Sequence, residues 1–406
     1  MTYIWYSRDT YSTSGSDQSL RALAETGTNW VSLIVMWYQG SYTESKILPR
    51  QNETATDESL IHAIRTTHNL GMKVMLKPHI DLNVQGQMRS DRGSIRASDV
   101  TAWFQSYRTF ILHYAQLAQS EQVEQFCVGT ELMGMSMYTQ YWYGIIDAVR
   151  RSYNGTLTYA SLATTTNDKW SEWKQVQFWD RLDYVGMDVY FPLTNKTDPT
   201  KAELTKGWSP YVTEIEAFQQ SVKKPIVFTE IGWVSVAGAN TGTWKWDHVC
   251  NPSDSQYDPS KCKPDPQEQA NLYEAALQVF WNRSWLQGIF WWTWYPYGTK
   301  VGYGEGGLND SYYSPHNKPA EQVLQSWYAQ PFIPQGTQPK AVAALVAIQR
   351  AENATATATR QDRTRNLSQA RDMLSQAVVA YNRAEFAHSE ELAKNAWKIA
   401  DSAVNK

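Results

Sequence analysis

Short apolar runs alternate with helical patterns from Thr2 to about Pro331, and this alternation restricts the fold more than any other feature of the chain. Apolar runs separated by amphipathic helices are typical of repeated βα units. We expect strands at Thr2–Tyr6, Trp30–Met36, Lys73–Lys77, Gln125–Val128, Leu157–Tyr159, Tyr184–Met187, Ile226–Phe228 and Gly288–Trp292. Strands in such regular alternation predict an α/β protein with a closed (β/α)8 TIM barrel rather than an open doubly wound sheet.

The regions between these strands carry helical patterns. We expect helices at Asp17–Thr26, Thr56–Leu70, Ser98–Gln119, Gln140–Ser152, Tyr211–Val222 and Pro266–Asn282. Gly27 and Gly71 lie where two of them end, as glycine often does. No Gly-x-Gly-x-x-Gly or Gly-Lys-Ser/Thr loop follows the first strand, which disfavours nucleotide binding.

Composition excludes several classes of partner. The chain has 406 residues, of which 42% are hydrophobic and 19% charged, enough to bury a large core. Its net charge is −3 and it has no basic stripe, so we expect no nucleic-acid partner. No apolar run approaches the ~18 residues that a membrane span needs. The 19 tryptophans and 24 tyrosines favour a carbohydrate ligand, because aromatic faces stack on sugars, although core packing explains some of them.

The cysteines give an indication of the cellular compartment. Cys250 and Cys262 lie in a Pro-, Asp- and Ser-rich loop, and we favour a disulfide between them over two free thiols. Such a bond would imply an oxidising compartment, whereas Cys127 lies in an apolar run as a small buried residue. The first residues carry no signal-peptide pattern. We expect a secreted or cell-surface protein whose signal is absent from this sequence, with a cytoplasmic protein as the alternative.

The end of the chain differs from the rest in composition. Residues 331–340 are rich in Pro, Gln and Gly and are expected to form a linker. Residues 341–406 are rich in Ala and charged residues, with apolar residues at helical spacing, and predict a helical hairpin or a three-helix bundle. We expect a docking or spacer module without chemistry; a role in oligomerisation or in tethering the protein to a partner is the alternative.

Two glutamates follow buried strands of the same design. Glu131 closes a stretch that begins with the apolar run Phe126–Val128, and Glu230 closes one that begins with Ile226–Phe228. A carboxylate at the end of a buried strand is poorly solvated, so either an ion pair or catalysis must account for it. In a parallel barrel, both would face the mouth where such folds keep their active sites. A facing pair of carboxylates is also what hydrolysis of a glycosidic bond requires.

Three segments of the chain together resemble glycoside hydrolase family 113. They are Cys-Val-Gly-Thr-Glu-Leu around Glu131, Phe-Thr-Glu-Ile-Gly-Trp around Glu230, and Tyr-Ser-Pro-His-Asn-Lys-Pro-Ala from Tyr313. The family belongs to a clan of retaining (β/α)8 glycosidases with carboxylates after strands four and seven, where the predicted strands also place these glutamates. The resemblance covers residues 1–330, which would form the catalytic domain, and leaves out the helical end.

The resemblance implies that Glu131 is the general acid/base and Glu230 the nucleophile of a double displacement. Glu230 must then stay ionised, whereas Glu131 needs desolvation and nearby negative charge to keep its proton. Retention predicts a carboxyl separation of ~5–5.5 Å, against ~6.5–9.5 Å for inversion. The clan often has Asn before the acid/base, where it holds the sugar 2-hydroxyl. Here that residue is Thr130, so this contact must be weaker or come from elsewhere.

Polar residues at other strand ends complete the predicted site. By its position after the sixth strand, Tyr190 would hydrogen-bond Glu230 and keep it ionised and oriented. Asp188 would bind a sugar hydroxyl, with a strand-end ion pair as an equal alternative. His79, after the third strand, is favoured as a hydroxyl ligand over a structural role, and Asp81 lies at the same mouth.

Tryptophans supply the expected sugar platforms. Trp292, at the end of the last strand, is similar in place to the platform under the cleaved sugar in the family. Side-chain alternation turns Trp291 outward, so we assign it to packing. Trp37, after the second strand, and Trp233, beside Glu230, are further stacking candidates, with core packing as the alternative.

Taken together, these features predict a retaining hydrolase of β-1,4-mannan or manno-oligosaccharides, the mannose preference resting on the resemblance alone. A β-glucan or amino-sugar hydrolase on the same barrel is one alternative, and a non-catalytic carbohydrate-binding barrel is another. The presence of both glutamates argues against the non-catalytic alternative. The histidines form no metal-binding motif and no nucleophile elbow is present, so we expect no cofactor and no metal.

Overall fold

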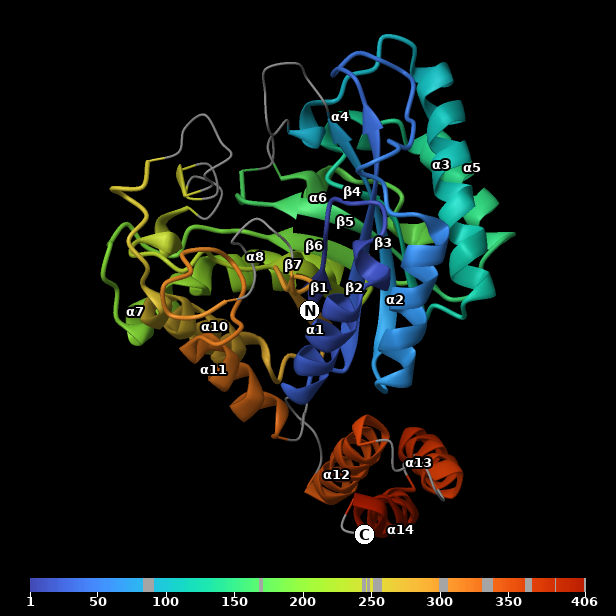
Figure 1. Ribbon diagram of the computed structural model, residues 1–406, viewed down its shortest axis with the longest axis vertical. Helices are drawn as coiled ribbons and strands as arrows, with labels where there is room; N and C mark the ends of the chain where they lie inside the picture. Colours follow the sequence, from blue (N-terminus) through green and yellow to red (C-terminus); the bar gives the residue numbers. More distant parts are fainter. Residues whose placement is uncertain are drawn as a thin grey trace.

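A barrel of eight parallel strands forms the body of the protein (Figure 1). The structure, a computed structural model, describes residues 1–82, 91–167, 171–242, 246, 249–250, 258–298, 306–330, 339–361, 367–383 and 385–404. The strands are β1 (Thr2–Tyr3), β2 (Trp30–Gln39), β3 (Lys73–Leu82), β4 (Gln125–Thr130), β5 (Thr156–Ala163), β6 (Val185–Val189), β7 (Ile226–Ile231) and β8 (Leu286–Trp291). Each strand pairs with its neighbour in sequence, and a parallel bridge between Tyr3 and Trp294 joins the end of β8 to β1. The predicted (β/α)8 fold is confirmed.

Helices alternate with the strands, as the sequence predicts. In the barrel they are α1 (Ser14–Glu25), α2 (Asp57–Asn69), α3 (Val100–Ser120), α4 (Met133–Ser136), α5 (Thr139–Arg150), α6 (Glu172–Gln175), α7 (Lys201–Gly207), α8 (Ser209–Val222), α10 (Pro266–Phe280) and α11 (Pro319–Tyr328). Side chains cap several N-termini: Thr13, Thr56 and Asp99 each accept a hydrogen bond from a backbone N–H of the first turn. These caps satisfy donors that have no partner within the helix, and so help to fix where α1, α2 and α3 begin.

The register of β2 and β3 decides which side chains reach the barrel interior. Strand β2 runs three residues further than its apolar core suggests, to Gln39, and β3 five residues further, to Leu82. The pairing sets Met36 opposite His79 and Trp37 opposite Ile80. Because side chains alternate along a strand, His79 shares one face of the sheet with Lys77, and Trp37 points to the other face.

A three-helix bundle follows the barrel. Its helices are α12 (Pro339–Arg360), α13 (Leu367–Asn382) and α14 (Phe386–Val404). Alanines dominate its buried positions, and the Arg350 guanidinium lies 3.6 Å from the centre of the Trp397 ring. Of the predicted 331–340 linker, residues 331–338 lie outside the described part of the chain.

The bundle lies against the end of the barrel where the strands begin (Figure 1). Arg360 donates a hydrogen bond of 2.7 Å to the carbonyl of Ala24, near the end of α1. Ala356 lies close to Gly71, in the turn between α2 and β3. Ala24 lies in the last turn of the helix that precedes β2, and Gly71 lies in the turn that leads into β3, so the bundle occupies the face opposite the carboxyl ends of the strands.

Cys250 and Cys262 form a disulfide with a Cα–Cα distance of 5.3 Å, whereas Cys127 is free and buried in β4. The bond closes a loop that spans 12 positions of the sequence between β7 and α10. Within the described residues, no helix is both long and apolar enough to span a membrane.

Candidate active site

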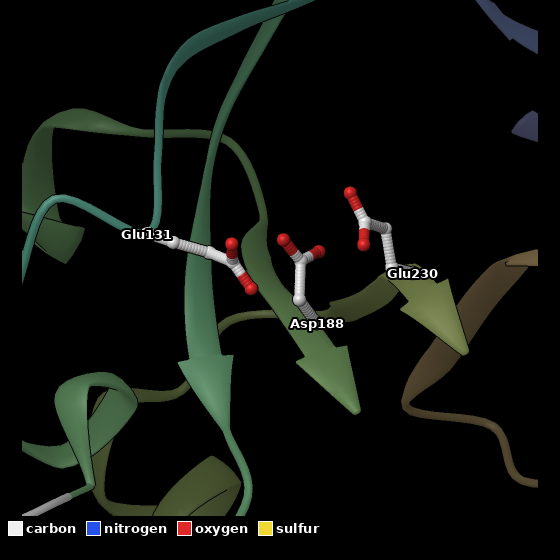
Figure 2. A group of neighbouring side chains, drawn as sticks. All are labelled: Glu131, Asp188 and Glu230. Atoms are coloured by element: carbon white, nitrogen blue, oxygen red, sulfur yellow. The ribbon is translucent and has the colours of Figure 1, made fainter. Parts of the chain in front are cut away.

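Three carboxylates meet at the mouth of the barrel. Glu131 directly follows β4, Asp188 lies in β6 and Glu230 lies in β7, opposite Asp188 in the strand pairing. One oxygen of each carboxylate lies within 4.8 Å of an oxygen of each of the others, and the side chains point toward one another (Figure 2). The structure therefore brings together the two glutamates that the sequence singled out, although 98 residues of the sequence lie between Glu131 and Glu230.

The backbone at Glu131 leaves the strand by a tight turn. Glu131 has a φ of +52°, in the left-handed region that residues other than glycine seldom adopt. Two hydrogen bonds hold this turn against β5: the Glu131 N–H donates to the Ala160 carbonyl at 2.8 Å, and the Leu132 N–H donates to the Tyr159 hydroxyl at 2.9 Å. The turn directs the Glu131 carboxylate across the mouth toward β6 and β7 (Figure 2).

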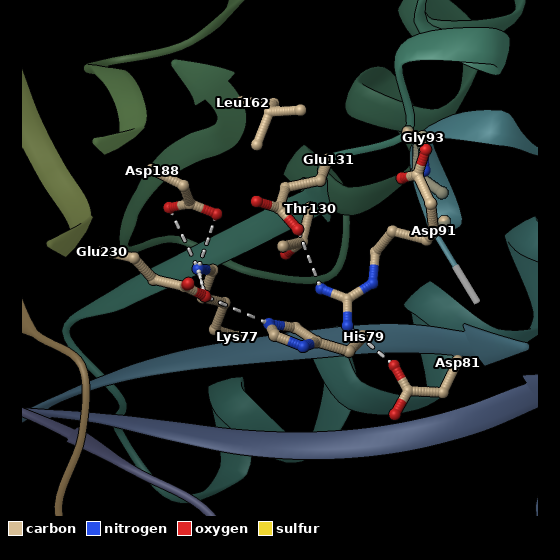
Figure 3. Close-up of polar contacts among 12 residues, drawn as sticks. Lys77, His79, Asp81, Asp91, Gly93, Thr130, Glu131, Leu162, Asp188 and Glu230 are labelled. Carbon is tan, nitrogen blue, oxygen red and sulfur yellow. Dashed lines mark hydrogen bonds and ion pairs between the residues drawn. The ribbon is translucent and has the colours of Figure 1, made fainter. Parts of the chain in front are cut away.

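Lys77 joins two of the carboxylates. Its ammonium group donates to Glu230 Oε1 at 2.5 Å and to both oxygens of Asp188, at 3.1 and 3.2 Å (Figure 3). The side chains of Lys77 and Asp188 are fully buried, and Asp188 also accepts a hydrogen bond of 2.6 Å from the Thr229 hydroxyl. A buried charge without a partner is very unfavourable, so Lys77 and this pair of carboxylates depend on one another.

The second oxygen of Glu230 has its own partner. The Tyr190 hydroxyl donates to Glu230 Oε2 at 2.7 Å, the contact that the sequence analysis predicts for Tyr190. Glu230 thus accepts one hydrogen bond at each oxygen, and both stabilise the ionised form.

An arginine contacts the other glutamate. Arg92, in the segment between β3 and α3, donates to Glu131 Oε2 at 3.3 Å and to Asp81 Oδ1 at 2.7 Å. Asp81 thus lies at the mouth, as expected, and its partner there is Arg92. The shorter distance to Asp81 makes it the main ionic partner of Arg92, and the contact with Glu131 is looser.

His79 is buried beside Glu230. Its Nε2 lies 4.0 Å from Glu230 Oε1, beyond hydrogen-bond distance, and has no hydrogen-bond partner within the described part of the chain. Burial, together with the charges of Arg92 and Lys77, lowers the pKa of His79 well below its usual value, so the imidazole is neutral. A buried ring nitrogen without a partner, at the mouth of a barrel, is available to a ligand hydroxyl.

The environment separates the proton affinities of the acidic groups. Burial first, and then the negative charges of Asp188 and Glu230, raise the pKa of Glu131 well above its usual value, against the opposing charges of Arg92 and Lys77. Burial and the charge of Glu230 raise the pKa of Asp188 to about 7. For Lys77, burial alone would lower the pKa, but Asp188 and Glu230 outweigh it and the pKa is raised. The cluster thus favours a proton on Glu131 and a charged Lys77.

The predicted tryptophans fall into two groups. Trp292 follows β8 and is partly exposed, and the peptide bond between it and Thr293 is cis. Trp291 is buried and stacks on Tyr273 of α10 at 4.2 Å, so its prediction as an outward packing residue is confirmed.

Trp37 and Trp233 pack away from the mouth. The Trp37 ring contacts Phe110 of α3 at 5.4 Å, and its N–H donates to the Tyr114 hydroxyl. Trp233 is 1% exposed and lies against Trp208 and Tyr273 at 6.2 and 6.1 Å. These positions fit the packing alternative for both residues rather than sugar stacking. Asp188 likewise has the ion pair that was its alternative, because Lys77 contacts both of its oxygens.

Sequence reasoning missed Lys77 and Arg92. Lys77 was assigned to the end of an apolar strand, but Lys77, His79 and Asp81 are polar residues at alternate positions, a pattern that indicates one polar face. Arg92 begins a three-residue 3-10 helix (Arg92–Ser94) between β3 and α3, and no periodicity distinguishes it from the other arginines of the sequence.

The sequence profile of Glycoside Hydrolase Family 113 matches residues 1–318, about four-fifths of the chain. The chain belongs to this family. It is therefore a glycoside hydrolase with a glycan substrate, as the resemblance of its glutamate segments predicts. The match ends before the three-helix bundle begins.

Solved structures of family 113 enzymes are similar to this chain. A GH113 β-mannanase from Alicyclobacillus acidocaldarius, in complex with ManMIm, is 26% identical, with a TM-score of 0.67; the alignment covers 81% of this chain and 96% of that one. A GH113 β-1,4-mannanase, also in a complex, is 25% identical with a TM-score of 0.66, over 81% and 97% of the two chains. Among curated proteins, none is similar enough to count as a relative.

Proposed function

We propose that this family 113 enzyme cleaves β-1,4-mannosidic bonds with retention of configuration, with Glu131 as general acid/base and Glu230 as nucleophile. The observation that carries the proposal is the approach of the two carboxylates to within 4.8 Å at the mouth of the barrel. Double displacement needs carboxyl groups about 5–5.5 Å apart, whereas inverting enzymes hold them about 6.5–9.5 Å apart to admit a water molecule.

The first step needs an ionised nucleophile and a protonated acid. Lys77 and Tyr190 each donate a hydrogen bond to Glu230, which keeps the carboxylate ionised and fixes its rotamer for attack on the anomeric carbon. The raised pKa of Glu131 keeps its proton available for the leaving oxygen. The opposite electrostatic environments of the two glutamates therefore match their opposite roles.

The second step reverses the role of Glu131. Once Glu230 forms the glycosyl–enzyme bond, it no longer carries the negative charge that raises the pKa of Glu131. Glu131 is then a carboxylate that can take a proton from water as the water attacks the anomeric carbon. The contact with Arg92 at 3.3 Å stabilises this ionised form.

Other residues hold the sugar in this proposal. Trp292, partly exposed beside the end of β8, is the platform under the sugar that is cleaved. His79, with an unpartnered Nε2 4.0 Å from Glu230, binds a sugar hydroxyl. Asp188 is fully buried and engaged by Lys77 and Thr229, so we propose that it acts on Glu230 through Lys77 and does not bind sugar.

The preference for mannose rests on the relatives. The two solved structures described above are named β-mannanases, and they align over most of the barrel. The partly exposed tryptophan and the carboxylate pair support a sugar substrate without distinguishing mannose from glucose.

We further propose that residues 1–330 are the catalytic domain, that residues 331–340 link it to the bundle, and that residues 341–406 have no part in the chemistry. The position of the bundle at the end of the barrel opposite the carboxylates supports this division. The disulfide between Cys250 and Cys262 supports an oxidising, extracytoplasmic compartment. Sedimentation with and without residues 341–406 tests whether the bundle assembles several copies.

The decisive experiment follows the products from defined manno- and gluco-oligosaccharides by proton NMR. We expect faster turnover of the β-1,4-manno series and first-formed products with the β configuration. Glu230→Gln should abolish turnover, whereas Glu268→Gln, a matched change at another buried glutamate, should not. Equal rates for the wild type and Glu230→Gln would refute catalysis by Glu230. First-formed products with the α configuration would refute retention.

A further inference from the structure

A buried tyrosine and a buried glutamate lie directly behind the acid/base turn. The Tyr159 hydroxyl accepts a hydrogen bond from the Leu132 N–H at 2.9 Å and donates one to Glu172 Oε1 at 2.6 Å. The other oxygen of Glu172 accepts from the Leu162 N–H at 2.8 Å. This chain of hydrogen bonds connects the residue after Glu131 to β5 through two side chains that do not reach the mouth.

The network contains a carboxyl group that the proposed mechanism does not use. Glu172, in α6, and Tyr159, in β5, are both fully buried. Burial raises the pKa of Glu172 to about 7 even though it accepts hydrogen bonds from Leu162 and Tyr159. A buried carboxyl group costs folding free energy, so its presence indicates that its hydrogen bonds are needed.

The turn at Glu131 needs the contacts that Tyr159 and Glu172 make. A φ of +52° is unfavourable for glutamate, by about 1 kcal/mol or more, and such a conformation persists only where its surroundings enforce it. The Ala160 carbonyl holds the N–H of Glu131 itself, and Tyr159 holds the next N–H. Gly129, two residues before Glu131, has no room for a side chain: an added Cβ would lie 2.7 Å from the Tyr159 ring.

We propose that Tyr159 and Glu172 are positioning residues that hold Glu131 in the orientation from which it protonates the leaving oxygen. The inference rests on the proposed role of Glu131 as acid/base. Neither residue touches the substrate: Tyr159 fixes the peptide between Glu131 and Leu132, and Glu172 fixes the hydroxyl of Tyr159.

The dependence of the rate on the leaving group tests this role. A β-1,4-manno-oligosaccharide needs protonation of its leaving oxygen, whereas 2,4-dinitrophenolate leaves without it. In Tyr159→Phe, we expect kcat/KM for mannotriose to fall about 10-fold or more, a part of the 10²–10⁴-fold that a general acid typically contributes. For 2,4-dinitrophenyl β-mannoside, kcat/KM should stay within about twofold of the wild type, as it should in Glu131→Gln.

Two further variants separate positioning from loss of folded protein. Tyr153→Phe is the matched control, because Tyr153 is also buried and donates one hydrogen bond, to the Val123 carbonyl at 2.7 Å, away from the turn. It should leave the ratio of the two kcat/KM values unchanged. Glu172→Gln keeps the size of the side chain but disturbs the bond to Tyr159, and should change the ratio in the same direction as Tyr159→Phe by a smaller factor.

The outcomes are distinct. An equal loss of kcat/KM on both substrates in Tyr159→Phe would overturn the positioning role while leaving the proposed function intact. An unchanged ratio of the two kcat/KM values in both Tyr159→Phe and Glu172→Gln would do the same. If Tyr159→Phe does not fold, Glu172→Gln alone decides between these results. Equal rates for the wild type and Glu131→Gln on mannotriose would overturn the acid/base assignment, and the positioning role with it.

Discussion

Replacing Lys77 by methionine should move the pH dependence of catalysis. The substitution keeps the approximate length of the side chain and removes the ammonium group that contacts Glu230 and both oxygens of Asp188. Two buried carboxylates then face each other without a counter-ion. At a pH where the wild type carries both charges, the variant must bind an additional proton, and whenever that proton is on Glu230 the nucleophile is inactive.

The expected shift follows from the distances. At about 3 Å and an effective dielectric constant of about 20, one ion-pair contact is worth about 5 kcal/mol. Even half of this value corresponds to about 2 pH units, at 1.36 kcal/mol for each unit. We therefore expect the acidic limb of the kcat/KM profile to move up by about 2 units or more, and kcat/KM at a pH below the wild-type limb to fall about 100-fold.

The assay is the hydrolysis of 4-nitrophenyl β-mannoside and of mannopentaose between pH 4 and pH 9. The alkaline limb reports loss of the proton from Glu131. Lys77 is the weakest of the charges that act on this proton and lowers the pKa of Glu131, so its removal should move the alkaline limb up less than the acidic limb. The two limbs of the variant should therefore approach each other and the maximum should fall.

Lys318→Met is the matched control. Lys318 is also buried, pairs with Asp310 at 3.3 Å, and has no contact with the three carboxylates. Either variant should lose about 3–5 kcal/mol of stability, because each leaves a buried charge without its partner. Only Lys77→Met should move the acidic limb. An unchanged acidic limb in a folded Lys77→Met enzyme would contradict the assigned role of the ammonium group.

Three other changes give independent tests. The raised pKa of Glu131 means that folding is opposed as pH rises above the ordinary carboxyl range, so Glu131→Gln should raise the Tm more at pH 7 than at pH 4; an equal effect at both values would contradict the electrostatic picture. Replacing both Cys250 and Cys262 by serine removes the loop closure and should lower the free energy of unfolding by about 2–3 kcal/mol in urea titrations, whereas no change would indicate that the loop adds no stability. Trp292→Ala should lower kcat/KM for manno-oligosaccharides about tenfold, or 1.4 kcal/mol, if the ring is the sugar platform; a change under about twofold would exclude that role.

The strands could be predicted because each contains a short, mainly apolar run. A strand buried on both faces has few alternatives, and the glutamates at the carboxyl ends of β4 and β7 then lie at one rim whatever the details of packing. Glu131 and Glu230 were therefore accessible from the sequence.

The errors came from strand ends and from loops. The end of β2 was expected at Met36, so Trp37 was placed at the mouth; the strand runs to Gln39, and alternation turns Trp37 outward toward α3. The same reasoning from alternation placed Trp291 correctly. Arg92 reaches Glu131 from a segment whose path depends on tertiary contacts, and local sequence contains no signal of that path.

Because the bundle docks onto the base of the barrel, the two ends of the molecule differ: one carries the bundle and the other the three carboxylates. Helix α14 lies beyond the end of the barrel opposite the three carboxylates, and Arg360 holds the bundle against α1 (Figure 1). An enzyme immobilised through α14 on a bead should therefore present its rim to an insoluble polymer rather than to the bead. Attachment through the loops that follow β4 or β7 would place the support in the path of the polymer.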